Sequence, residues 1–125
     1  MHCNVWIKHK DKFVIYFAKR SEKLKSFPSY IDNTVAGGQP INLSIFENLK
    51  KEAYEEAGIS SKYLKKVQRG NIVSYFHNSN NNFISAVIFN YHLNKIDELE
   101  LKNIDGEVES FFSLTLENIY KLIEK

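Results

Sequence analysis

The sequence has 125 residues, of which 43% are hydrophobic and 26% are charged, and its formal net charge is +2. This length and composition favour a single packed domain over residues 1–125 and exclude a disordered chain. The small net charge predicts no binding to nucleic acid, and no apolar run approaches the roughly 18 residues that cross a bilayer. The single cysteine, Cys3, excludes an internal disulfide, and we expect a cytoplasmic location.

The first part of the chain alternates strand-forming segments with turns. Residues 5–8 and 12–19 are rich in Val, Ile, Phe, Tyr and Trp and predict two antiparallel strands joined by a short turn. Residues 21–30 mix charged residues with a proline and predict a loop. A short strand is expected over residues 31–36, ending at the glycine pair 37–38.

The most clearly marked element is a helix over residues 44–57. Its apolar residues recur every four positions, at Ile45, Leu49, Ala53 and Ala57. Ser44 followed by Glu47 is the pattern of a capping box at the start of the helix. Gly58 stands where a left-handed residue ends a helix, and we expect Ile59 to pack back on the last turn.

The second half of the chain predicts further strands and a closing helix. Residues 72–77 and 83–93 predict two strands that flank a polar loop over residues 78–82. Another strand is expected over residues 108–114, followed by a helix over residues 115–124. The order strands, helix, strands, helix predicts an α/β (α+β) protein with a mixed sheet and helices packed on its faces.

Three glutamates lie on one face of the predicted helix. Glu52, Glu55 and Glu56 stand at i, i+3 and i+4, and like charges at these spacings cost roughly 0.2–0.5 kcal/mol per pair. A hard divalent cation would remove this cost, because Mg²⁺ and Mn²⁺ prefer oxygen ligands. The alternative is an acidic face in solvent, in which Glu47 and Lys51 pair across one turn.

Residues 37–59 resemble the Nudix box, G-x5-E-x7-R-E-U-x-E-E-x-G-U, in which U is aliphatic. They align with it without gaps, and the matching positions are Gly37, Glu52, Ala53, Glu55, Glu56, Gly58 and Ile59. Two positions depart from the pattern: Leu43 stands where the first glutamate is usual, and Lys51 replaces the arginine. In the family those two side chains support the loop and helix, so the resemblance implies an altered scaffold and a retained metal site.

The resemblance implies a Nudix-like α/β/α sandwich with a central mixed sheet, and an enzyme that cleaves a diphosphate linkage in a small molecule with Mg²⁺ or Mn²⁺. It implies Glu56 and Glu52 as principal metal ligands and the carbonyl of Gly37 as a further ligand. Glu55 is an additional ligand or orients the attacking water, and these roles could permute. Another ligand or the general base is expected at one of two residues outside the box, Glu107 or Glu109.

Longer motifs resemble one branch of the family, the Nudix proteins related to the domain found with thiamine pyrophosphokinase. They are residues 18–21 and 27–28, the run 32–38 and the run 105–111. This branch implies thiamine diphosphate or its oxidised analogues as substrate. The alternatives are a hydrolase of a nucleoside diphosphate derivative and a catalytically silent Nudix-like domain that binds a nucleotide or a partner protein.

Other residues have both a functional and a structural interpretation. Arg20, with Lys19 beside it, is expected to hold the substrate's phosphates, or else to mark a strand end in solvent. Trp6, Phe17 and Tyr30 are expected to be core side chains or to stack on an aromatic ring. The four histidines lack ligand spacing and receive no role. The oligomeric state stays open, with a homodimer as one alternative.

Overall fold

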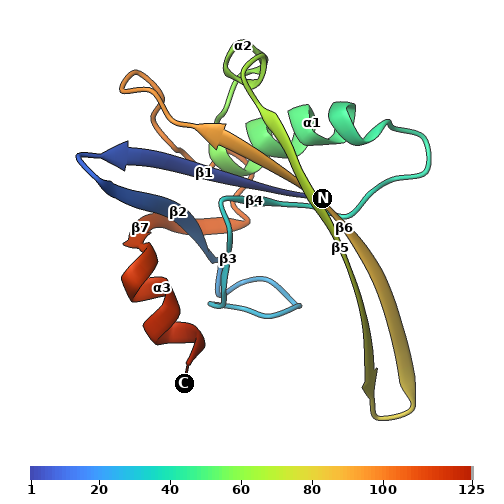
Figure 1. The fold of residues 1–125 in the computed structure, drawn as a ribbon. Helices are drawn as coiled ribbons and strands as arrows, with labels where there is room; N and C mark the ends of the chain where they lie inside the picture. The colour runs from blue at the N-terminus through green and yellow to red at the C-terminus, as the bar shows by residue number, and fades with distance from the viewer. Residues whose placement is uncertain (125) are drawn as a thin grey trace.

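The computed structural model describes residues 1–124, except the side chain of Ser79, so residue 125 of the predicted single domain lies outside the described range. A seven-stranded sheet forms the centre of the fold (Figure 1). Its strands are β1 (His2–His9), β2 (Lys12–Arg20), β3 (Ile31–Asn33), β4 (Val35–Ala36), β5 (Gln68–Ser79), β6 (Asn82–Asn94) and β7 (Val108–Thr115). The helices are α1 (Ile45–Ala57), α2 (Ser61–Leu64) and α3 (Leu116–Ile123).

The sheet is mixed, as the order of elements predicts. Its main path is β3-β2-β1-β6-β5, with β4 paired to β1 and β7 paired to β2. Strands β1 and β6 are parallel, whereas β1 pairs antiparallel with both β2 and β4. In Figure 1, α1 and α3 lie on opposite sides of β1 and β2, and the β5–β6 hairpin extends beyond the other strands. Within residues 1–124, no helix is long and apolar enough to cross a membrane.

Both predicted ends of α1 are confirmed. The Glu47 N–H donates to Oγ of Ser44, and the Ser44 N–H donates to Oε2 of Glu47 at 2.9 Å, which closes the capping box. At the other end Gly58 has φ +66°, and the Ile59 N–H donates to the carbonyl of Ala53 at 2.9 Å. These contacts fix where α1 stops, and therefore where its last glutamates lie.

The core lies between α1 and the centre of the sheet. The side chains that share it include Cys3, Val5, Val35, Leu49, Ala53, Ala57, Ile59, Leu64 and Leu93. Burial raises the pKa of the Cys3 thiol to about 12. The thiol therefore stays protonated and packs as a small apolar side chain.

The single strand predicted over residues 31–36 is wrong, because Thr34 divides it into β3 and β4. Strand β3 pairs with β2, whereas β4 pairs with β1, so the chain crosses between neighbours at this point. The buried Thr34 hydroxyl accepts the Val5 N–H at 3.0 Å and donates to the Tyr16 carbonyl at 2.5 Å. The hydroxyl thereby satisfies a backbone N–H of β1 and a backbone carbonyl of β2 at the point where the chain passes from one strand to the other, and the chain then continues towards Gly37.

The predicted loop over residues 78–82 is too long. Strands β5 and β6 stay paired as far as Ser79 and Asn82, which leaves only Asn80 and Asn81 in the turn. Both turn residues have positive φ, +48° and +67°, as a two-residue type I′ hairpin requires and as asparagine tolerates. The helix predicted over residues 115–124 is α3, which begins at Leu116 after its cap Thr115, whereas the four-residue helix α2 was not predicted.

Candidate active site

Glu56 lies on the last turn of α1, in a narrow crevice between this helix and the sheet. The crevice is lined by Ala18, Arg20, Asp32, Asn33, Ala36, Glu56, Glu107 and Val108. Glu56 is only 7% exposed, and its Oε2 accepts the Ala36 N–H at 3.0 Å. Since Ala36 ends β4, this hydrogen bond joins α1 to the strand that leads into Gly37.

The surroundings of Glu56 favour its neutral form. Burial raises the pKa of Glu56 to about 8, and the nearby charges of Glu52, Glu107 and Asp105 act in the same direction. The hydrogen bond from Ala36 opposes the shift without cancelling it. In the part of the chain that the structure describes, no basic side chain forms an ion pair with Glu56. A cation placed beside this carboxyl would stabilise its ionised form.

Gly37 gives Glu52 room to reach the same region. A β-carbon at Gly37 would lie 2.7 Å from Cγ and 2.8 Å from Cδ of Glu52. The glycine is held in place by Met1, whose amino nitrogen donates to the Gly37 carbonyl at 2.7 Å and whose carbonyl accepts the Gly37 N–H at 3.0 Å. The side chain of Glu52 is 15% exposed and is the second carboxylate next to Glu56.

Lys51 faces the other two glutamates of the predicted patch. Its Nζ atom lies 3.2 Å from Oε1 of Glu52 and 3.0 Å from Oε2 of Glu55. Glu47 bonds Ser44 instead, so the alternative pairing of Glu47 with Lys51 is not formed. Across residues 1–124, no group of three or more His, Cys, Asp or Glu side chains is already arranged to hold a metal ion. The metal roles of Glu52, Glu55 and Glu56 therefore stay predictions.

The donor atoms at the crevice nevertheless fit a hard divalent cation. Glu56 and Glu107 line the crevice, and Glu52 lies beside Gly37 with its charge close enough to contribute to the raised pKa of Glu56. These carboxylates, and the Gly37 carbonyl once it exchanges its contact with the Met1 amino group, are oxygen donors of the type that Mg²⁺ and Mn²⁺ prefer. The raised pKa of the buried Glu56 carboxyl is a second reason, because a divalent cation beside it would supply the positive charge that its ionised form needs. Glu52 and Glu56 would hold such a cation, and Glu55 would join them after releasing Lys51.

Of the two candidates outside the box, the structure brings Glu107 to Glu56. Glu107 lines the crevice and contributes to the raised pKa of Glu56. Its backbone is fixed on both sides, because its carbonyl accepts the Ser21 N–H at 2.9 Å and its N–H donates to Asp105 at 2.9 Å. Glu109 instead forms an ion pair with Lys19 at 3.1 Å.

Arg20 lines the crevice but organises the loop that follows β2. Its guanidinium lies 3.2 Å from the Asp32 carboxylate and donates to the carbonyls of Ser26 and Phe27 at 2.9 and 3.2 Å. Lys19 is engaged with Glu109, so both basic residues have protein partners. Their predicted contacts with phosphate stay predictions.

The predicted aromatic candidates differ in their surroundings. Phe17 stacks on Phe112 with ring centroids 6.0 Å apart, and Trp6 packs against Phe13 at 5.6 Å, so both are held within the sheet. Tyr30 is 60% exposed and packs against Phe27, which is 67% exposed, at 5.4 Å. Of the three candidates, Tyr30 is therefore the one placed to meet a ligand from solvent.

Asn48 is a residue that sequence reasoning missed. It is fully buried on α1, and its Nδ2 donates to the Gly38 carbonyl at 2.7 Å and to Gln39 at 3.3 Å. Gln39 in turn donates to the Leu43 carbonyl at 2.7 Å. The loop is therefore held without the glutamate that is usual at position 43. The sequence did contain one signal for Asn48, namely a polar residue next to Leu49 at a position of α1 that faces the core.

An open groove adjoins Gly37 on the side of the β5–β6 hairpin. Its volume is about 410 Å³, and residues 37–39 form one wall. The hairpin contributes the opposite side through Tyr75, Ala86, Val87, Ile88 and Phe89. The volume lies within the range of small-molecule sites.

No family model matches the chain, but its sequence is similar to segments of curated plant proteins. Over 125 residues the chain is 32% identical to Nudix hydrolase 24, chloroplastic, and 34% identical to Nudix hydrolase 20, chloroplastic, both of Arabidopsis thaliana. These alignments cover 100% of this chain but 34% and 33% of the two plant proteins. The chain thus spans about a third of the length of the curated relatives it matches.

Solved structures share the fold. An Ap4A hydrolase of C. elegans, in a binary complex, aligns with a TM-score of 0.67 at 14% identity, over 99% of this chain and 84% of that chain. The Nudix domain of Shewanella oneidensis NrtR, complexed with ADP ribose, aligns with a TM-score of 0.68 at 10% identity, over 96% and 73%. The chain therefore has the Nudix fold, which confirms the predicted fold class, and its sequence is similar to segments of two proteins named Nudix hydrolases.

Proposed function

We propose that this protein is a divalent-metal-dependent hydrolase that cleaves a diphosphate linkage, X–O–P–O–P, in a small phosphorylated metabolite. The observation that carries the proposal is the buried Glu56 carboxyl, which has Glu52 and Glu107 beside it and a pKa raised to about 8. A carboxyl perturbed by burial and by neighbouring anions is typical of a functional site. The full-length match to segments of two proteins named Nudix hydrolases supports the same activity.

Each residue of the site has a role in the proposal. Glu56 and Glu52 hold Mg²⁺ or Mn²⁺, together with the carbonyl of Gly37. Glu55 is either an additional ligand or the residue that orients the attacking water, and Glu107 is a further ligand or the general base. A cation bound there would neutralise phosphate oxygens of the substrate. Arg20 and Lys19 would contact the phosphates after exchanging their present partners.

For the substrate, we propose thiamine diphosphate or one of its oxidised analogues. The support is the set of motifs before and after α1, over residues 18–21, 27–28, 32–38 and 105–111, that resemble the thiamine-associated branch. A nucleoside diphosphate derivative is the second candidate, because two structural neighbours are an Ap4A hydrolase and a Nudix domain complexed with ADP ribose. Both substrate classes carry planar rings, and the groove of about 410 Å³ beside Gly37 has the volume of a small-molecule site.

The test is release of phosphate and monophosphate from a panel of substrates with Mg²⁺ and with Mn²⁺. The panel contains thiamine diphosphate, its oxo and oxy analogues, ADP-ribose, dinucleoside polyphosphates and modified nucleotides. Turnover concentrated on the thiamine compounds supports the proposed substrate. Turnover on a nucleotide retains the chemistry and discards the thiamine assignment. A folded protein that is inactive on the whole panel contradicts the proposal.

A catalytically silent Nudix-like domain is the competing function. It is favoured by one observation: the ammonium group of Lys51 already forms ion pairs with both Glu52 and Glu55. Thermal unfolding with Mn²⁺ and a non-hydrolysable diphosphate distinguishes the proposed hydrolase from a silent domain that has lost its metal site. A site saturated at about 100 times its dissociation constant adds about 2.7 kcal/mol to the free energy of unfolding, whereas a lost site adds little.

A cytoplasmic location is also part of the proposal. The two plant relatives are named chloroplastic, so the location needs its own test. Imaging of the tagged full-length protein in its own cells would decide it, because an organellar signal contradicts the proposed compartment.

A further inference from the structure

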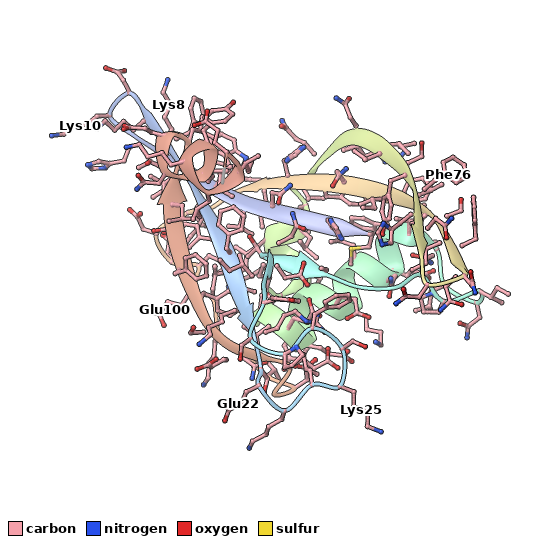
Figure 2. All side chains as sticks on the ribbon, turned by 90° about the horizontal axis from the view of Figure 1, so that it is seen from below. Lys8, Lys10, Glu22, Lys25, Phe76 and Glu100 are labelled. Atoms are coloured by element: carbon pink, nitrogen blue, oxygen red, sulfur yellow. The ribbon has the colours of Figure 1, made fainter. Side chains whose placement is uncertain are left out.

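The loop between β2 and β3 carries an exposed pair of aromatic rings. Phe27 and Tyr30 are both more than half exposed, and their ring centroids lie 5.4 Å apart. Figure 2 shows two charged residues of this loop, Glu22 and Lys25, at the edge of the molecule and apart from Phe76 of the β5–β6 hairpin. The ring pair is therefore separate from the exposed hydrophobic side chains of the hairpin.

The loop is tied to residues that line the Glu56 crevice. Nε of Arg20 donates to the carbonyl of Phe27 at 3.2 Å, and its backbone N–H donates to the carbonyl of Tyr30 at 2.9 Å. The loop begins at Ser21, whose N–H donates to the Glu107 carbonyl at 2.9 Å. Arg20 and Glu107 both line the crevice, so its walls and the aromatic rings are held in one arrangement.

Two residues of this loop have a left-handed backbone although neither is glycine. The φ angle is +47° at Phe27 and +62° at Ser29. This conformation is unfavourable for residues with a β-carbon, above all for bulky ones, and it persists where surrounding contacts impose it. Such residues cluster at binding and catalytic sites. The loop therefore accepts a conformational cost in the turn that brings Phe27 and Tyr30 together.

The two rings line a hollow that adjoins the crevice. Its volume is about 260 Å³, and the residues that line it are Arg20, Phe27, Tyr30, Ile31 and Asp32. Arg20 and Asp32 line the crevice as well, so their ion pair forms the boundary between the two spaces. A cavity of about 150 Å³ already accommodates a benzene ring. The hollow is therefore large enough for one planar ring next to the arginine.

We infer that the Phe27–Tyr30 pair binds a planar heteroaromatic ring in the X group of the substrate, while the diphosphate lies at Arg20. The inference rests on the proposed function and names its substrate class as ring-bearing diphosphates. Heteroaromatic rings stack on exposed aromatic side chains whatever their hydrogen-bonding groups, because each has a π-face. Nη1 of Arg20 pairs with Asp32, whereas Nε and Nη2 hold the loop. A phosphate can therefore replace Asp32 at Nη1 without releasing the rings.

The groove beside Gly37 is the competing place for the ring. Its aromatic residues are Tyr75 and Phe89, and of the residues that line the crevice only Ala36 also lines this groove. Among residues 1–124, no lysine or arginine lines the groove. The hollow instead places two rings beside a guanidinium, so one ligand can meet the rings with its ring and the guanidinium with its phosphate.

The test is calorimetric titration with Mg²⁺ and two probes that cannot be hydrolysed, the α,β-methylene analogues of ADP and of thiamine diphosphate. Tyr30→Leu and Phe27→Leu each remove one ring and keep an apolar side chain. Each should weaken binding of the better probe by about 5- to 100-fold, the equivalent of one lost base–aromatic stack. Tyr30→Phe keeps the ring and should bind as the parent does. The matched control is Tyr120→Leu, at an exposed tyrosine of α3, which should also bind as the parent does.

The two ring-bearing probes distinguish the source of the ring, because the tighter one shows whether a thiamine or a nucleoside compound is preferred. Unchanged affinity in both leucine variants of the loop would overturn the inference. A loss in Tyr30→Phe as large as in Tyr30→Leu would assign the effect to the hydroxyl and also overturn it. An equal loss in Tyr120→Leu would do the same. Circular dichroism confirms folding, and either loop variant is sufficient if the other unfolds.

A third probe, methylenediphosphonate, has no ring and separates this inference from the proposed function. It should bind the parent and Tyr30→Leu equally, because it makes no contact with the loop rings. If it binds while the loop variants bind the ring-bearing probes as the parent does, the inference fails and the proposed function stands. If none of the three probes binds the folded parent, both fail.

Discussion

Gly37 and Glu52 pack directly on one another: a β-carbon on the glycine would lie 2.7 Å from Cγ of the glutamate. The neighbouring Gly38 has no atom within 4 Å of the same position. The two glycines therefore differ in what they permit, although they are adjacent in the sequence. Only Gly37 leaves the space through which Glu52 approaches Glu56.

This difference gives the first prediction, on the glycine pair. Gly37→Ala should displace the Glu52 side chain and weaken Mn²⁺ binding, measured by electron paramagnetic resonance of free Mn²⁺. Gly38→Ala should bind Mn²⁺ as the parent does, because its β-carbon points into open space. Equal affinities in the two variants would show that the close packing of Gly37 on Glu52 does not position a metal ligand.

The raised pKa of Glu56 predicts a dependence of stability on pH. Its pKa is about 8 in the folded protein and ordinarily 4.5, so between these values the folded state retains a proton that the unfolded state has lost. The free energy of unfolding should therefore fall as pH rises through this window, by up to about 1.4 kcal/mol per pH unit. The slope should be smaller in Glu56→Gln, whose amide still accepts the Ala36 N–H.

Urea denaturation without divalent cations, at about pH 6 and about pH 8.5, measures this slope. Glu22→Gln is the matched control, because Glu22 is exposed and outside the crevice. Parallel pH profiles for the parent and Glu56→Gln would show that Glu56 is not held neutral in the folded protein.

Lys51 competes with the cation for Glu52 and Glu55, so its removal should strengthen metal binding. Lys51→Met should lower the apparent dissociation constant for Mn²⁺ several-fold in calorimetric titrations. Lys50→Met removes a neighbouring lysine that forms neither ion pair, and it should behave as the parent. Weaker binding in Lys51→Met would mean that this lysine positions the carboxylates and does not compete for them.

The end of α1 requires a glycine for two reasons. Gly58 has φ +66°, and a β-carbon there would lie 2.9 Å from the carbonyl oxygen of Lys102. Gly106 has φ +89° but open space around it. Each substitution by alanine should cost about 1–2 kcal/mol for its left-handed backbone, and Gly58→Ala should cost more because of the contact. Chemical denaturation compares the two, and an equal loss would contradict the steric contribution.

The sequence predicted those features of the fold that depend on contacts between residues close together in the chain. The capping box at Ser44, the left-handed Gly58 and the apolar row of α1 are each set by contacts within a few residues. The division of residues 31–36 by Thr34 was not predictable in this way, because it follows from two strands that are distant in sequence. The tight turn at residues 80–81 was missed because consecutive asparagines fit both a long loop and a type I′ turn.

The same difference between local and long-range contacts decides how much of the candidate site could be predicted. The spacing of Glu52, Glu55 and Glu56 was sufficient to predict that they share one helix. It could not show that Lys51 faces two of them while Glu56 turns towards Ala36, because these choices depend on tertiary contacts. Nor could the sequence choose between Glu107 and Glu109, of which Glu107 lines the crevice with Glu56.

The most direct test of the account is turnover as a function of Mn²⁺ concentration, for the parent, Glu56→Gln and the exposed control Glu22→Gln. It uses the best substrate of the panel and variants whose folding is confirmed by circular dichroism. The account predicts metal-dependent turnover in the parent and control, and a loss of at least about 100-fold in Glu56→Gln, as when a preorganised charge contact is removed. Parental turnover with the same metal dependence in Glu56→Gln would contradict the assignment of this crevice as the active site.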